Sequence, residues 1–181
     1  MTEYDSIIRE ICRIDKEEAE VMLVQLLRLA HADGIFDDAE KNMIQRIMKK
    51  YNGSQNFYEI LTKSDDELDI SLITHTEHML LYMIMLAYID GKLSHEEWLQ
   101  IKETAESVQI DHNRLDELYL IVKRKLYNTM LRQIYSIDIE STIREKFLNN
   151  IKEYLNLPDE YAEIEENRIT AKFGSRLLRN C

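Results

Sequence analysis

Apolar residues recur at three- and four-residue spacing along almost the whole chain, which is the period of an amphipathic α-helix. The second half of segment 71–89 is apolar nearly all round, which is typical of a central, enclosed helix. The regular apolar positions between residues 111 and 135 are Leu115, Leu118, Val122, Leu126, Met130 and Ile134. The pattern predicts an all-α fold.

Capping signals divide this pattern into about seven to eight helices. Asp15, with Glu18 three residues later, is a capping-box pattern, and Gly34 and Gly91 are residues that accept the left-handed conformation after a helix. The expected helices cover residues 5–14, 15–33, 38–51, 71–89, 94–108, 111–135 and 141–155, with a last one after Pro158.

The chain carries an internal repeat with an offset of 57 residues: 22–44 matches 79–101, with eight of 23 positions identical. The identical pairs are Met22/Met79, Leu23/Leu80, Leu29/Leu86, Ala30/Ala87, Asp33/Asp90, Gly34/Gly91, Glu40/Glu97 and Ile44/Ile101. Each copy must bury the same apolar stripe, so we expect two helix–turn–helix units, 15–51 and 71–108, related by a pseudo-twofold axis. They form a domain at 1–136, and 137–181 form a C-terminal helical extension packed on it or appended to it.

Helix-to-helix turn chemistry explains part of the repeated motif. Asp37 with Glu40, and Ser94 with Glu97, are both capping-box patterns. The aspartates of the motif, Asp33 and Asp90, are not explained in this way. A carboxylate in the last turn of a helix costs roughly 0.3–1 kcal/mol against the helix dipole. Two interpretations stay open: the aspartates accept hydrogen bonds from loop amides, or they hold a cation.

Hard cations prefer several oxygen ligands on a short loop, and the repeated loops supply carboxylates. The expected metal ligands are Asp33, Asp37 and Glu40 in the first loop and Asp90 and Glu97 in the second. The expected cofactor is a divalent cation (Ca²⁺, Mg²⁺, Mn²⁺ or Zn²⁺), and the alternative is no cofactor. The spacing is not that of an EF-hand.

The two units, LAHADGIFDDAEKNMI and LAYIDGKLSHEEWLQI, resemble the tellurite-resistance TerB-like family over about residues 15–130. The resemblance implies an all-α fold of two similar helical hairpins, a cytoplasmic, non-enzymatic role in stress response or complex assembly, and an acidic cluster that binds divalent metal. By position, the matching acidic residues are Asp33, Glu40, Asp90 and Glu97. Residues 137–181 extend past the usual core of the family.

Composition narrows the function classes. The formal net charge of −11 argues against nucleic-acid binding, which needs a basic face. The longest apolar run, Met79–Ile89, is short of the roughly 20 residues that span a bilayer, and no secretory signal is visible, so we expect a cytoplasmic chain. The basic end, 167–181, predicts at most an indirect membrane contact. No nucleophile with a paired base stands out, so we expect no enzyme.

Two functional hypotheses follow. The first is a TerB-like module in which a divalent cation organises the acidic loops. The second is a purely structural adaptor without metal, which binds a protein partner through its C-terminal helices. The oligomeric state is left open by the sequence.

Overall fold

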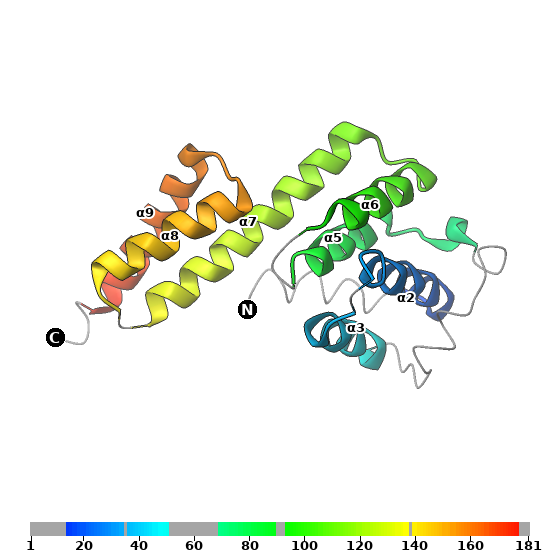
Figure 1. Cartoon of the computed structure of the whole chain (residues 1–181), viewed down its shortest axis with the longest axis horizontal. Helices are drawn as coiled ribbons and strands as arrows, with labels where there is room; N and C mark the ends of the chain where they lie inside the picture. Colours follow the sequence, from blue (N-terminus) through cyan, green and yellow to red (C-terminus); the bar gives the residue numbers. More distant parts are fainter. Residues whose placement is uncertain (1–13, 35, 51–68, 90–92, 138, 178–181) are drawn as a thin grey trace. The chain divides into compact units, whose positions relative to one another are not determined.

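The computed structural model describes residues 14–34, 36–50, 69–89, 93–137 and 139–177. These residues form seven α-helices and one 3₁₀ turn and contain no strand, which confirms the all-α prediction (Figure 1). The helices are α2 (Lys16–Ala30), α3 (Asp38–Lys50), α5 (Thr76–Ala87), α6 (His95–Ser107), α7 (His112–Ser136), α8 (Ser141–Leu155) and α9 (Asp159–Leu177), with the 3₁₀ turn η2 at Ile70–Leu72. The helix expected at 5–14 lies outside the described residues.

Most helix boundaries agree with the sequence to within one or two residues, because local caps set them. The main exception is the start of α5. A helix was expected from Ser71, but α5 begins at Thr76 and is preceded by η2, whose N-cap Asp69 accepts the Ser71 N–H at 3.0 Å. The expected start is therefore wrong, because the chain makes a separate capped turn first.

The chain divides into two compact units, 1–119 and 120–181, and the boundary falls inside α7. In the first unit, α2 packs against η2, α3, α5 and α6. The domain predicted at 1–136 rests on the repeat and on the family resemblance, and it stays a prediction.

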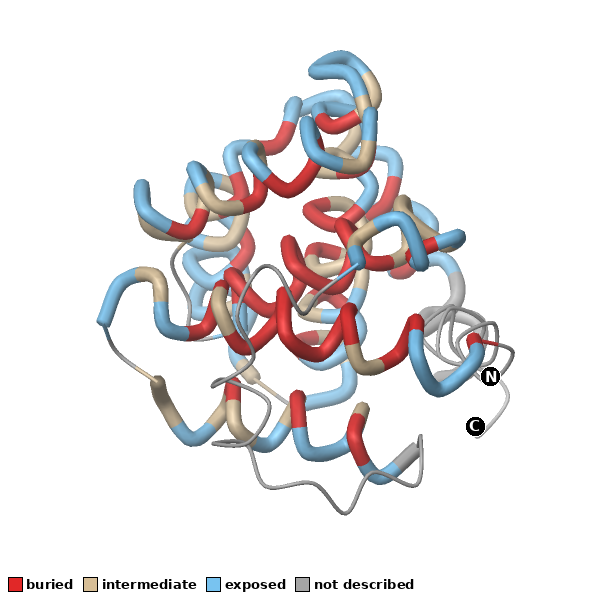
Figure 2. Tube along the Cα trace, turned by 90° about the vertical axis from the view of Figure 1, so that its right-hand side faces the viewer, coloured by how far each residue is buried: buried red, intermediate tan, exposed pale blue. Residues whose placement is uncertain are grey.

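The core of the first unit is built on α2 and α5. Leu26, Leu27 and Leu29 of α2 are fully buried, as are Met83 and Ile84 of α5. Every residue of α5 from position 79 onward is buried, which confirms the enclosed helix expected there. Figure 2 shows how buried positions alternate with exposed ones along most of the other helices. Burying a leucine, isoleucine or methionine side chain of this core contributes roughly 1.5–3 kcal/mol to the stability of the fold.

The second unit has polar groups inside its three-helix packing. The hydroxyl of Tyr127, which is fully buried, donates to Glu166, and Lys152 Nζ lies 2.9 Å from the same carboxylate. Burial, followed by the hydrogen bond to Glu166, raises the pKa of Tyr127. Lys123 donates from Nζ to the carbonyl of Asn156 at 2.9 Å, and burial lowers the pKa of its amine. These contacts tie α7 to the end of α8 and to α9.

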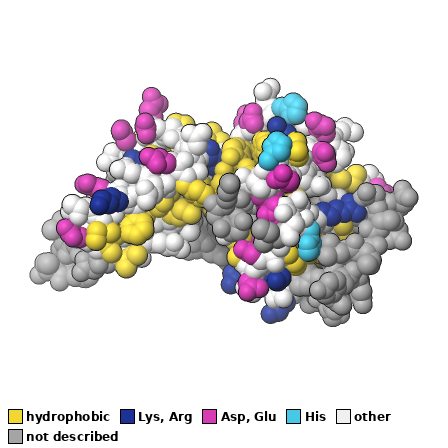
Figure 3. All heavy atoms as spheres, viewed as in Figure 1, with side chains coloured by type: hydrophobic (Ala, Val, Ile, Leu, Met, Phe, Trp, Pro, Cys, Tyr) yellow, Lys and Arg dark blue, Asp and Glu magenta, His cyan; other side chains and the backbone are white. Residues whose placement is uncertain are grey.

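The described surface carries both charged and apolar side chains. On the face in Figure 3, acidic side chains are scattered widely, while hydrophobic side chains gather in patches. The large hydrophobic side chains that are exposed are Leu72, Ile89, Leu99, Ile121, Ile137, Ile143, Phe147 and Ile164. Among the helices described, none is both long and apolar enough to span a bilayer.

Candidate functional site

The first repeated loop is closed by a capping box at the start of α3. Asp37 Oδ1 accepts the Glu40 N–H at 2.8 Å, and Glu40 Oε2 accepts the Asp37 N–H at 2.9 Å. Glu40 is only 5% exposed. The capping box expected from the sequence is therefore confirmed, and the glutamate of the motif has a structural task.

The second repeated loop has the same construction at the start of α6. Ser94 Oγ accepts the Glu97 N–H at 3.1 Å, and Glu97 Oε2 accepts the Ser94 N–H at 2.7 Å. Glu97 is buried like its counterpart Glu40. Two reciprocal hydrogen bonds at each loop satisfy amides that the first turn of a helix leaves unpaired. Each box therefore has a structural task at the start of its helix.

Asp33 lies in the turn that follows α2. The helix ends at Ala30 with His31 as its C-cap, so Asp33 stands beyond the last helical turn. The sequence pattern placed Asp33 within that turn, and this prediction is wrong. Gly34 follows with φ +81°, the left-handed conformation expected for a glycine that ends a helix. Asp33 is exposed to solvent, and its counterpart Asp90 lies outside the described residues.

The expected metal ligands do not form a ready-made site in the described part of the chain. Among those residues, no three His, Cys, Asp or Glu side chains are grouped as metal ligands. Glu40 and Glu97 each commit a carboxylate oxygen to a capping box, so a cation would share these carboxylates with the helix starts. Asp33 and Asp37 belong to the same turn region between α2 and α3.

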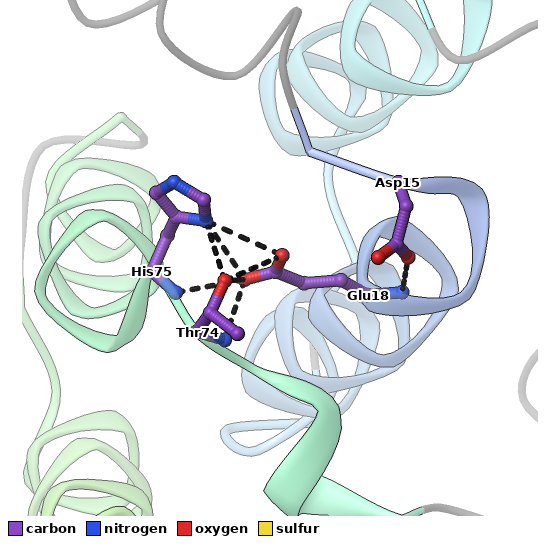
Figure 4. A network of polar contacts seen from close by, with 4 residues as sticks. All are labelled: Asp15, Glu18, Thr74 and His75. Carbon is purple, nitrogen blue, oxygen red and sulfur yellow. Dashed lines mark hydrogen bonds and ion pairs between the residues drawn. The ribbon is translucent and has the colours of Figure 1, made fainter.

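A third acidic residue, Glu18, links α2 to the start of α5 (Figure 4). Its carboxylate accepts the backbone N–H groups of Thr74 and His75, each at 2.8 Å, and the Thr74 hydroxyl at 3.0 Å. The His75 ring nitrogen Nδ1 lies 3.1 Å from the same carboxylate. Glu18 is 2% exposed. A buried carboxylate from one helix thus caps another helix, whose N-cap residue makes no side-chain cap of its own.

The capping box expected at Asp15 and Glu18 is therefore only half correct. Asp15 Oδ1 accepts the Glu18 N–H at 2.8 Å, as expected. The Glu18 carboxylate points across to Thr74 and His75 instead of returning to Asp15 (Figure 4). Glu18 is the buried partner of this contact, and three donors of Thr74 and His75 satisfy its carboxylate.

Arg114 of α7 pairs with Glu77 of α5. Its Nε and Nη2 groups donate to the two carboxylate oxygens at 2.6 and 2.7 Å, which is a bidentate pair. This hydrogen bonding lowers the pKa of Glu77 below its ordinary value. His78, beside Glu77, has its ring centroid 5.8 Å from that of His75. Neither belongs to a three-ligand group among the residues described.

A surface hollow of about 320 Å³ lies beside Trp98 in the first unit. It is lined by Leu93, Ser94, His95, Trp98, Asp116 and Tyr119. The Trp98 and Tyr119 rings have centroids 5.0 Å apart. The sequence patterns did not predict this site. No spacing pattern links residues of α6 and α7 that meet only after folding.

Comparison with known proteins gives no match to a family model, a curated protein or a solved structure. The resemblance to the TerB-like family therefore stays a prediction based on the repeated motif.

Proposed function

We propose that the chain is a non-enzymatic, cytoplasmic interaction module of the TerB-like type, which binds a protein partner through the helices of its second unit. One observation carries the proposal. Ile143 and Phe147 stand four residues apart on α8, so they share a helix face, and they are 45% and 51% exposed. Ile164 of α9 is 63% exposed. Covering side chains of this kind is a main source of association energy.

The biological role in this proposal comes from the resemblance. The TerB-like family implies stress response or complex assembly, and the acidic charge of the chain argues against a nucleic-acid partner. No catalytic step is proposed, because the sequence pairs no nucleophile with a base. The first unit then serves as the helical body of the module.

The test compares two double variants of α8 with the wild-type chain as bait in cross-linked extracts of the source cells. Ile143→Ser/Phe147→Ser removes the apolar pair, and Glu145→Ser/Asn149→Ser changes two other exposed positions of the same helix. We expect a partner that is enriched by the wild type and the control and lost from the apolar variant. A partner set that is the same for all three chains, with unchanged thermal melts, overturns the proposal.

Cation binding at the first loop is the second candidate. Asp33 and Asp38 are exposed and Asp37 is half-buried, so three carboxylates lie within six residues at the solvent boundary. Carboxylate oxygens are the ligands that Ca²⁺ and Mg²⁺ prefer. Asp38 also lies 3.4 Å from Lys41 Nζ, which competes with a cation for this carboxylate.

The chain supplies its own control for the cation test. Asp37→Ser keeps a capping hydroxyl, since the second repeat uses Ser94 for the same task. Calorimetric titration of the EDTA-stripped chain with each divalent cation should give saturable heat that Asp33→Asn/Asp37→Ser loses without a change in melting temperature. Absence of heat with every ion, or equal heat in the variant, removes the first loop as a cation site.

A further inference from the structure

The hollow beside Trp98 combines an aromatic wall with a carboxylate. Trp98 and Tyr119 line it with rings tilted by 42°, and Asp116 stands on the same helix as Tyr119. The Tyr119 hydroxyl lies 2.6 Å from the hydroxyl of buried Tyr88. This hydrogen bond fixes the Tyr119 ring before any ligand arrives, which reduces the entropic cost of binding.

Asp116 is exposed and has no hydrogen-bond or ion-pair partner within the described part of the chain. The capping box at Ser94 and Glu97 sets the start of α6, and the Trp98 N–H donates to the Ser94 carbonyl at 3.2 Å. The aromatic wall is therefore held by a defined helix start. A carboxylate beside aromatic faces attracts a cation by two independent effects, ion pairing and the ring quadrupole.

The first repeat also brings together an aromatic ring, a carboxylate and a cation, and there the chain itself supplies all three. Lys41 Nζ lies 5.3 Å from the Phe36 ring centroid and 3.4 Å from Asp38, so an ammonium group is held between an aromatic ring and a carboxylate. With the 57-residue offset, Trp98 stands at the position of Lys41 and Leu93 at that of Phe36. The second repeat thus presents an aromatic ring where the first presents its cation.

We propose that this hollow binds an arginine side chain of a partner polypeptide. The planar guanidinium stacks on the indole of Trp98 and donates hydrogen bonds to Asp116, and the aliphatic stem covers Leu93. Arginine suits the site better than lysine, because its planar fork serves stacking and carboxylate pairing together. The net charge of −11 favours a basic partner. The hollow lies in the first unit, whereas the proposed function uses α8 and α9 of the second. A negative result at one of the two sites therefore leaves the proposal for the other intact.

Trp98 is the only tryptophan of the chain, so its fluorescence reports directly on the hollow. The probe is the peptide acetyl-Gly-Arg-Gly-amide, and the same peptide with citrulline, a neutral analogue of arginine, is the ligand control. We expect a saturable change in Trp98 fluorescence with the arginine peptide and none with the citrulline peptide. Asp116→Asn should weaken binding about fivefold or more. Glu103→Gln removes one charge from an exposed position of α6 outside the hollow and should have less effect.

Lys102 gives a test in the opposite direction. Its Nζ lies 5.3 Å from the Trp98 ring centroid, so it competes with the arginine for the indole. Lys102→Gln should strengthen binding of the arginine peptide. No saturable change up to about 10 mM peptide overturns the proposal. Equal binding of the citrulline peptide also overturns the proposal. The same holds if Asp116→Asn and Glu103→Gln weaken binding of the arginine peptide to the same extent.

Discussion

The carboxylate of Glu18 accepts the backbone N–H of His75, and the two residues are 57 positions apart, which is the offset of the internal repeat. They therefore occupy equivalent positions in the two units. Equivalent residues contact each other only where they lie close to the axis that relates the two copies. The contact supports the pseudo-twofold arrangement that the repeat predicts, and it ties α2 to the start of α5.

Replacing Glu18 tests how much this contact contributes. Glu18→Ala removes Oε1, the oxygen that accepts the backbone N–H groups of both Thr74 and His75. We expect the free energy of unfolding to fall by about 1–3 kcal/mol, because the N–H groups of Thr74 and His75 lose their charged acceptor. Urea unfolding followed by circular dichroism measures the change.

Glu17→Ala is the matched control, since Glu17 is exposed in the same turn of α2. It should change the free energy of unfolding by no more than about 0.5 kcal/mol. Equal losses from the two variants would contradict a capping role for Glu18.

The second capping box predicts a pair of results at Ser94. Ser94→Ala removes the acceptor for the Glu97 N–H and should cost about 0.5–2 kcal/mol of unfolding free energy. Ser94→Asp should be close to neutral, because Asp37 performs the same task in the first repeat. Thermal melts of the two variants beside the wild type decide the matter. A Ser94→Ala chain as stable as the wild type would show that the box contributes nothing.

The sequence predicted what local chemistry determines. The boundaries of α6 and α8, and both repeated capping boxes, depend on residues within four positions of one another. The start of α5 depends on Glu18, 57 positions from His75, and no local signal reports that contact. The hollow beside Trp98 likewise needs Asp116 from another helix. Sequence patterns locate elements, and contacts distant in sequence complete the sites.

The pair of Glu77 and Arg114 predicts a loss of stability in acid. The hydrogen bonds from Arg114 lower the pKa of Glu77 in the folded chain below its ordinary value of 4.5. Such a carboxylate stabilises the fold above that ordinary value, and its contribution is lost as the pH falls through the lower, folded-state pKa. The difference in unfolding free energy between wild type and Glu77→Gln should therefore shrink from pH 7 to about pH 3. A constant difference over this range would show that the pair of Glu77 and Arg114 does not cause the loss of stability in acid.

Tyr127 predicts the opposite dependence in the alkaline range. Burial raises its pKa in the folded chain above the ordinary value of 10.0, so the unfolded chain ionises first as the pH rises. Its contribution is complete below pH 10 and is lost above it. Tyr127→Phe should cost about 1 kcal/mol at neutral pH for the lost hydrogen bond to Glu166 and show a shallower alkaline decline. Urea unfolding between about pH 9 and pH 11 measures both effects, and parallel declines in the two chains would contradict the assignment.

The meeting of Glu18 with His75 also determines which repeats pair. Two copies of the first repeat, joined by the same symmetry, would bring two Glu18 carboxylates together in a buried place, where like charges repel. Two copies of the second would leave the amides at His75 without the carboxylate that accepts them. A first repeat with a second satisfies both sides. The contact therefore favours the pairing of unlike repeats over the pairing of like ones, whether the two repeats belong to one molecule or to two.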